Sequence, residues 1–276
     1  MGLSRIKGQD AALTHLRSAF ESKRLAHAYL FHGPEGVGKE SAALEFAAAL
    51  NCDVGGLEGC GTCPSCRMAA KLAHPDIHLV FPVPRDAKSE EVAEVVAEQV
   101  KAGYREGDFG RKAAIISVEV VLDAVVAQAN QRPYTGPWKV FVVADADAMT
   151  PEASNTLLKT LEEPPEATAL ILTTARPNTL PATVLSRCQR IQFRRLSHET
   201  IEEILLSDKR LGFNKARAKA AALVSLGSAG RAVRATRRCG RGSQPRASRA
   251  ARSTMRTCAR SPGGRRSIGR LRRART

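Results

Sequence analysis

The sequence predicts an α/β fold in which helices cover a parallel sheet, followed by a smaller helical domain. Three observations lead to this expectation. Strand patterns alternate with helix patterns through residues 9–174, a glycine-rich turn separates the first strand from the next helix, and about 230 residues precede an arginine-rich tail. About 230 residues are enough for one α/β domain and a small helical one.

The first half of the chain provides two strands among several helices. Residues 9–22 are amphipathic, the apolar run at 28–32 is typical of a strand, and a helix follows the glycine-rich turn. A short helix closes a group of cysteines, and the charged segment 85–111 contains one helical stretch. The expected elements are helices at 9–22, 41–50, 66–72 and 90–102, and strands at 28–32 and 77–81.

The second half adds two strands that are apolar throughout. A helix is expected at 118–130, and the run at 138–144 predicts a strand buried on both faces. The helix at 150–163 stops before two prolines, because proline cannot continue a helix. The last buried strand is expected at 169–174.

Residues 33–40, GPEGVGKE, match a nucleotide-phosphate loop except at the last position. The candidate nucleotide-binding residues are Gly33, Gly36, Gly38, Lys39 and Glu40, with Glu40 in place of the serine or threonine that holds Mg²⁺. Two unit charges 4 Å apart repel by about 4 kcal/mol at an effective dielectric constant near 20, so this carboxylate crowds a triphosphate. We expect a loop that can hold phosphate but is poorly built for metal-assisted hydrolysis. The alternative is a glycine-rich turn without a ligand.

The buried strand at 138–144 ends in a second incomplete motif. An ATPase places an acidic pair here to hold Mg²⁺ and polarise water, whereas this chain has Ala144 followed by Asp145. If Ala144 is at the metal-holding position, a second magnesium ligand is missing and Asp145 alone remains at the water-polarising position. An alignment shifted by one residue would instead let Asp145 hold metal.

Four of the seven cysteines lie within fifteen residues. Cys52, Cys60, Cys63 and Cys66 have the spacing C-x7-C-x2-C-x2-C, with glycines and a proline between them that allow tight turns. This pattern predicts a tetrahedral zinc site with four sulfur ligands and no open position, which is structural rather than catalytic. An iron–sulfur cluster is less suited, since its fourth ligand would fall at Ala70, and unmetallated thiols are the other alternative.

No run of 18 apolar residues and no signal peptide is present, so we expect a soluble, cytoplasmic protein without membrane contact. In that compartment the cysteines do not indicate a disulfide framework.

The formal net charge of +16 is confined to the end of the chain. Residues 231–276 contain sixteen arginines and no lysine, aspartate or glutamate, which leaves 27 basic and 27 acidic residues in the rest. The body is therefore neutral and predicts no basic groove. We interpret the arginine-rich tail either as a disordered arm that binds nucleic acid or, preferably, as the product of a shifted reading frame.

Two further segments carry a family resemblance. Residues 149–165 read MTPEASNTLLKTLEEPP, and residues 180–188 read LPATVLSRC. With the cysteine group and the two incomplete motifs, they resemble the AAA+ clamp-loader ATPases, and among them the delta-prime subunits of bacterial DNA polymerase III. The resemblance covers about residues 5–232, and residues 227–232 look like the start of the last helix of a lid domain.

The resemblance implies a pentamer that opens a sliding clamp and closes it around primed DNA, using ATP bound at subunit junctions. Its expected partners are the clamp-loader motor subunits and the clamp-opening delta subunit, and through the complex the clamp and DNA. In such a family Arg187 is the catalytic arginine finger that acts in trans on a neighbour's ATP. The alternative for Arg187 is a surface ion pair. Thr173 and Thr174 match a phosphate-sensing position and are expected to be structural remnants in a subunit without its own ATPase activity, an accessory to a DNA-directed DNA polymerase.

The chain departs from the family at its end. We expect an AAA+ domain at 1–194 with a zinc module at 52–66, a helical lid at 195–232 and the tail at 233–276. The tail replaces the helical collar domain that such subunits use for assembly, since it has no apolar periodicity.

Two other functions stay open. One is an active motor ATPase of the same superfamily, which would need a hydroxyl at position 40 and an acid at 144. The other is a zinc-bearing nucleic-acid-binding protein that uses the tail, although a tail alone would give little sequence specificity.

Overall fold

The computed structural model describes residues 2–102 and 113–242. The predictions for residues 103–111, and for the tail beyond 242, lie outside the described residues. A five-stranded sheet forms the centre of the fold, and every pair of neighbouring strands is parallel. In spatial order the strands are β2 (Ile77–Val80), β5 (Lys139–Val143), β6 (Thr168–Thr174), β1 (Ala28–His32) and β7 (Gln189–Gln192).

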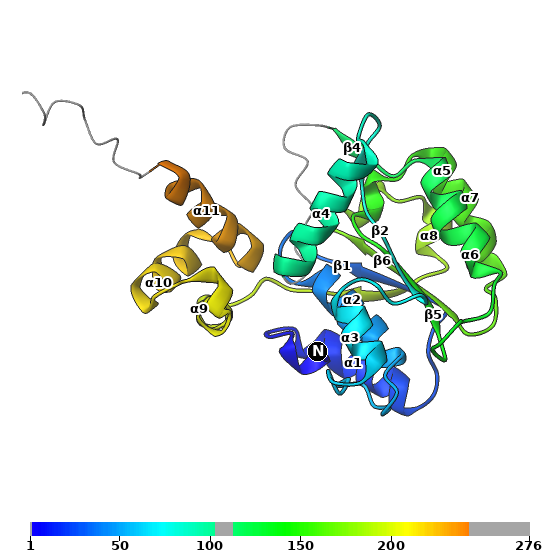
Figure 1. The fold of residues 1–276 in the computed structure, drawn as a ribbon, viewed down its shortest axis with the longest axis horizontal. Coiled ribbons are helices and arrows are strands. Elements are labelled where there is room, and N and C mark those ends of the chain that lie inside the picture. The colour runs from blue at the N-terminus through cyan, green and yellow to red at the C-terminus, as the bar shows by residue number, and fades with distance from the viewer. Residues whose placement is uncertain (1, 103–112, 243–276) are drawn as a thin grey trace, which may run out of the picture. The chain divides into compact units, whose positions relative to one another are not determined.

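Both faces of the sheet are covered, as its apolar strands require. Successive side chains point to opposite faces, so Tyr29 and Phe31 of β1 pack in one hydrophobic core and Leu30 in the other. Helices α1 (Asp10–Glu21), α2 (Lys39–Leu50) and α3 (Pro64–Ala70) lie on the first face. On the second lie α5 (Val118–Val121), η2 (Leu122–Val126), α6 (Ala127–Ala129), α7 (Pro151–Glu162) and α8 (Ala182–Leu185) (Figure 1).

The remaining elements of this domain are short or peripheral. A two-stranded antiparallel sheet pairs β3 with β4, and the charged segment contains α4. These elements, with the short helical turns, are η1 (Leu3–Arg5), β3 (Val83–Pro84), α4 (Ser89–Ala102), β4 (Ala114–Ile115), η3 (Ala146–Ala148) and η4 (Pro177–Thr179).

The predicted elements are confirmed, with boundary shifts that have local causes. The helix expected from residue 41 begins at Lys39, because Gly38 adopts a left-handed conformation (φ 98°) as its N-cap. The helix expected at 118–130 is interrupted by the π-helical turn η2, in a segment with five β-branched valines that fit a regular helix less well. Strand β7 was not predicted, since it is an edge strand with exposed Arg190 and Gln192 on either side of a single buried residue.

A group of helices follows the sheet, at the place of the predicted lid, and is called the lid below. Its hydrophobic core includes Ile201, Leu205, Ala218, Ala222 and Val233. Its helices are α9 (His198–Ser207), η5 (Lys209–Leu211), α10 (Lys215–Val224) and α11 (Ala229–Gly242), so the predicted lid boundary at residue 232 falls inside α11.

Across residues 2–102 and 113–242, no helix combines the length and the apolar character needed to cross a lipid bilayer.

Candidate functional site

The phosphate loop joins β1 to α2 and is closed around its own lysine. The Lys39 side chain is nearly buried, and its Nζ donates to the carbonyl oxygens of Gly33 and Pro34 at 2.9 and 2.8 Å. Glu40, the second residue of α2, is half-buried at the position where a hydroxyl was expected. The loop thus joins a strand to a helix as predicted, and the charged end of its lysine is held by loop carbonyls.

The lid contacts this loop directly. The Gly230 N–H at the start of α11 donates to the Gly36 carbonyl oxygen at 3.0 Å. A Cβ atom on Gly36 would lie 2.5 Å from Ser228 Oγ and 2.9 Å from Gly230 Cα, and its φ of +68° also favours glycine. Gly36 therefore serves the close approach of α11 as well as the bend of the loop.

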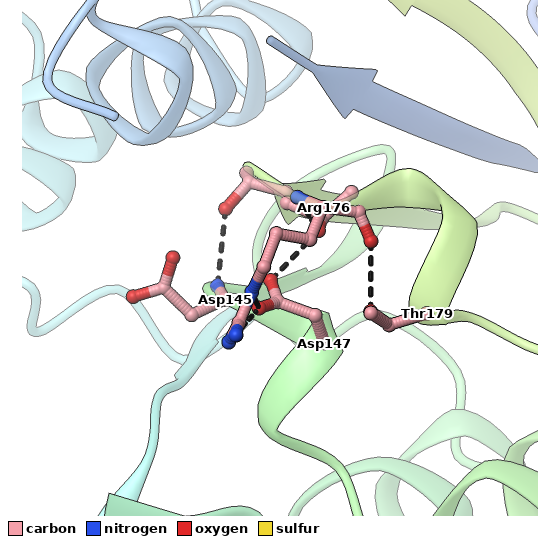
Figure 2. Close-up of polar contacts among 6 residues, drawn as sticks. Asp145, Asp147, Arg176 and Thr179 are labelled. Carbon is pink, nitrogen blue, oxygen red and sulfur yellow. Dashed lines mark hydrogen bonds and ion pairs between the residues drawn. The ribbon is translucent and has the colours of Figure 1, made fainter. Parts of the chain in front are cut away.

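The carboxyl ends of β5 and β6 carry a polar network next to the loop (Figure 2). The Thr174 hydroxyl donates to Asp147 Oδ1 at 2.7 Å and accepts the Arg176 N–H at 2.9 Å. Arg176 in turn binds Asp147 Oδ2 through Nε and Nη2, at 2.9 and 2.7 Å. The Asp145 N–H donates to Thr173 Oγ1 at 3.2 Å, and Figure 2 shows the Asp145 side chain pointing away from the Asp147–Arg176 pair.

Thr174, which matches the predicted phosphate-sensing position, is part of this network. Thr174 gives its single hydroxyl proton to the nearly buried Asp147, so it cannot also donate to a phosphate unless that bond breaks. The hydrogen bond that Arg176 donates to Asp147 raises the pKa of Arg176, and the charges of Glu35 and Asp145 act in the same direction. The exposed guanidinium of Arg176 therefore balances the negative charge of the nearly buried Asp147 at this edge of the sheet.

The predicted nucleotide residues are brought together by the strand order. Because β6 lies between β5 and β1, the loop after β1 is next to the end of β6, and the Gly33 N–H donates to the Thr174 carbonyl oxygen at 3.3 Å. Ala144 is the first residue after β5, is buried, and has no side-chain oxygen that could hold a metal ion.

Arg187 lies in the turn between α8 and β7, and its described contacts do not include the phosphate loop. Its Nη2 binds Glu162 Oε1 at 2.7 Å, and its Nη1 donates to the Thr183 carbonyl oxygen at 3.0 Å and approaches Ser186 Oγ at 3.4 Å. Cys188, the next residue, is buried, and burial raises the pKa of its thiol to about 11. The motif therefore combines one partly exposed cation with a buried anchor.

The four clustered cysteines converge after the C-terminal end of α2. Their Sγ atoms all lie within 4.8 Å of one another, and all four are free thiols. Zinc–sulfur bonds of 2.3 Å in a tetrahedron place sulfur atoms about 3.8 Å apart, so the donor set fits such an ion. Since α2 has 12 residues, the cluster is roughly 18 Å from the phosphate loop, at 1.5 Å per residue.

A buried carboxylate holds the loop ahead of β5. Asp76 accepts the backbone N–H groups of Tyr134, Thr135 and Gly136 at 2.6, 2.7 and 2.9 Å, and the Thr135 hydroxyl at 3.0 Å. Burial acts to raise the pKa of Asp76, but these four donors favour the charged form and leave the pKa below its usual value.

Hydrogen bonds join this loop to the cysteine cluster. Burial lowers the pKa of His74, whose neutral ring accepts the Asp76 N–H at Nδ1 and contacts Ser65 Oγ through Nε2 at 3.3 Å. On the other side, the Trp138 N–H donates to Asn51 Oδ1 at 3.1 Å. Ser65 lies between two of the cysteines and Asn51 directly precedes another, so the cluster and the loop support each other.

Replacing Asp76 with asparagine should destabilise the protein by about 2 kcal/mol, because three backbone donors lose their charged acceptor. A carboxyl group with a depressed folded pKa stabilises above its unfolded pKa, and this contribution is lost as the pH falls through the folded value. Urea unfolding from pH 7 to pH 3 should therefore show a smaller acid-dependent loss in the variant. The exposed Asp123→Asn substitution is the control, and equal curves for wild type and Asp76→Asn would contradict the assignment.

A protein-family comparison matches residues 8–197 to the family described as DNA polymerase III, delta subunit. The chain belongs to this family. The delta-prime subunit of DNA polymerase III from Bacillus subtilis is a relative, 33% identical over 72% of this chain and 51% of its own length. The tau subunits of B. subtilis and Escherichia coli are 32% and 30% identical, over 71% and 81% of this chain and 30% of theirs.

This member of the DNA polymerase III delta subunit family spans about half the length of its delta-prime relative and less than a third of the tau relatives. Among solved structures, it resembles the RuvB Holliday junction branch migration motor of Thermotoga maritima. The TM-score is 0.50 at 14% identity, over 85% of this chain and 62% of that one. That likeness is one of fold, and together with the parallel sheet it confirms the predicted α/β fold class.

Several residues of this family member that shape the sites were not predicted. Each of these residues contacts a partner at least 25 positions away in the sequence, so no known motif spacing identifies it. They are Asp147, Arg176, Glu162 and Asp76. The available signal was weak: Asp147 follows the acidic strand end, and Glu162 lies in the LKTLEEPP segment.

Proposed function

We propose that this chain is a non-hydrolysing clamp-loader subunit of the delta-prime type, which supplies Arg187 to ATP bound by a neighbouring motor subunit. The proposal rests on the combination of residues in this chain. The Ser-Arg-Cys motif has a partly exposed arginine, as an arginine finger requires. Position 40, however, has no hydroxyl and position 144 no acid, although an ATPase needs both to hold Mg²⁺.

One contact supports a subunit that does not hydrolyse ATP itself. The Thr174 hydroxyl donates to Asp147, whereas a hydrolytic site would need that hydroxyl to sense a phosphate. We infer that Gly33, Gly36, Gly38, Lys39, Glu40, Asp145 and Thr174 are vestiges of a nucleotide site.

In the proposed role, the Arg187 guanidinium lies against the γ-phosphate of the neighbour's ATP. As the phosphoryl group transfers, charge builds on its oxygens, and a fixed guanidinium stabilises that charge more than it stabilises the ground state. Arginine suits this role because it is planar and permanently charged.

We propose zinc as the ion of the Cys52, Cys60, Cys63 and Cys66 cluster. Four thiolates would complete its coordination, so the ion would fix the loop between α2 and α3 and take no part in hydrolysis. The proposed partners of the chain are motor subunits and a clamp-opening delta subunit, with the sliding clamp and primed DNA reached through the complex in the bacterial cytoplasm.

Reconstitution tests this function. The chain, with its present carboxyl end or with a helical collar domain in place of the tail, is combined with motor and clamp-opening subunits, and clamp loading onto primed DNA is measured. We expect loading with the collar-bearing form and no ATP turnover by the chain alone. Steady turnover by the isolated chain would instead support a motor ATPase, and no loading by either form would refute the proposal.

A further inference from the structure

The Arg187 side chain is held by three acceptors rather than extended into solvent. Two are local, the Thr183 carbonyl oxygen and the Ser186 hydroxyl, while the third is Glu162 Oε1 at the C-terminal end of α7. The Ser186 hydroxyl itself donates to the Thr183 carbonyl oxygen at 3.1 Å. The arginine is thus tied to two different helices.

These contacts leave one side of the guanidinium available. They use Nη1 and Nη2, and within the described part of the chain no acceptor contacts Nε. Arginine binds phosphate through its N–H groups, and the Nε–H is one of them. A phosphate oxygen could therefore approach Nε while Glu162 stays at Nη2.

Glu162 is the acceptor that fixes the direction of the side chain. The backbone acceptor at Thr183 lies one helical turn before Arg187 and would be met by several rotamers, whereas the carboxylate comes from another helix. Without it, the arginine would rotate among the many conformations that a long side chain samples, and ordering it would oppose phosphate binding.

We propose that Glu162 is a positioning residue for the arginine finger, which holds Arg187 in a phosphate-ready direction before a neighbour's nucleotide arrives. This inference rests on the proposed function of Arg187. It assigns a role to one of two adjacent glutamates in the LKTLEEPP segment: Glu162 contacts Arg187, and the exposed Glu163 begins the turn that follows α7.

Stability is a poor explanation for this pair. The side chains of Arg187 and Glu162 are 35% and 50% exposed, and ion pairs at such exposure contribute little to folding. The isosteric Glu162→Gln substitution should therefore leave the melting temperature unchanged. A purely structural role would predict the opposite.

The test uses the reconstituted assembly with Glu162→Gln, and Glu163→Gln as the matched control. In Glu162→Gln we expect kcat for ATP hydrolysis at the junction served by this chain to fall about tenfold. The KM for ATP should stay within about twofold, since most of the loss is in the transition state. Glu163→Gln should match wild type. An unchanged or raised kcat in Glu162→Gln, or an equal fall in both variants, would overturn the inference.

A second measurement needs no assembly. In the isolated full chain, ¹⁵N relaxation of the Arg187 Nε–H group should report greater motion in Glu162→Gln than in wild type or Glu163→Gln. Equal order in all three would also overturn the inference. The proposed function fails separately: if Arg187→Ala leaves junction turnover unchanged, Arg187 is no finger, whereas a loss in Arg187→Ala with none in Glu162→Gln removes the positioning role alone.

Discussion

Replacing Arg187 with alanine is expected to lower ATP hydrolysis at the junction with the neighbouring motor subunit by about a thousandfold or more, the range found for arginine fingers. The alanine variant removes the cation that stabilises charge on the transferring phosphoryl group, and leaves Thr183, Ser186 and Glu162 at the surface, where water can solvate them. Single-turnover hydrolysis, in an assembly whose other ATP sites are inactivated, measures the effect without dilution by sites that this chain does not serve.

The control for this substitution is Arg190→Ala. Arg190 is exposed, lies three residues further along and carries the same charge, so it reports any general effect of losing a cation near the junction. Assembly of both variants is checked by gel filtration. Equal turnover in Arg187→Ala and wild type, with both assembled, would exclude Arg187 as the trans-acting group.

The other large effect is expected from the cysteine cluster. Cys66→Ser should remove the bound metal and lower Tm by about 10 °C, which corresponds to about 3 to 4 kcal/mol for a domain of this size. The ion would hold together a loop rich in turns, and that loop also supports the Asp76 segment through Ser65 and His74. Elemental mass spectrometry and scanning calorimetry measure the two quantities on the same sample.

Cys188→Ala provides the comparison, because Cys188 is a buried cysteine outside the cluster. We expect this variant to keep one zinc ion per chain while losing some packing stability. Metal-free wild-type protein purified without chelators, or full metal content in Cys66→Ser, would contradict the zinc proposal.

The parts of the molecule that could be predicted from sequence are those in which neighbours along the chain decide the outcome. Gly38 and Lys39 sit in a strand–loop–helix unit whose conformation follows from glycine freedom and apolar spacing, and the four cysteines converge within fifteen residues. The buried strands β5 and β6 are apolar throughout, which marks them without knowledge of their partners.

The contacts that could not be predicted from the sequence join residues that only the folded chain brings together. Thr174 and Asp147 are 27 positions apart, and Glu162 and Arg187 are 25 apart, so neither pair has a spacing that a helix or strand period would reveal. The edge strand β7 was missed for a related reason. In the sequence, the exposed Arg190 and Gln192 are as typical of a loop as of a strand. Only the pairing with β1 in the folded chain identifies this segment as a strand.

The bond between Thr174 and Asp147 also bears on how this chain could regain an ATPase function. Returning a hydroxyl to position 40 and an acid to position 144 would repair the two visible defects, yet the sensing hydroxyl would still be committed to Asp147, and Asp147 to Arg176. If this chain does not hydrolyse ATP, as we propose, regaining hydrolysis would require changes at positions 40 and 144 and also the release of the Thr174 hydroxyl from Asp147. Repair of the phosphate loop alone would then not restore the site.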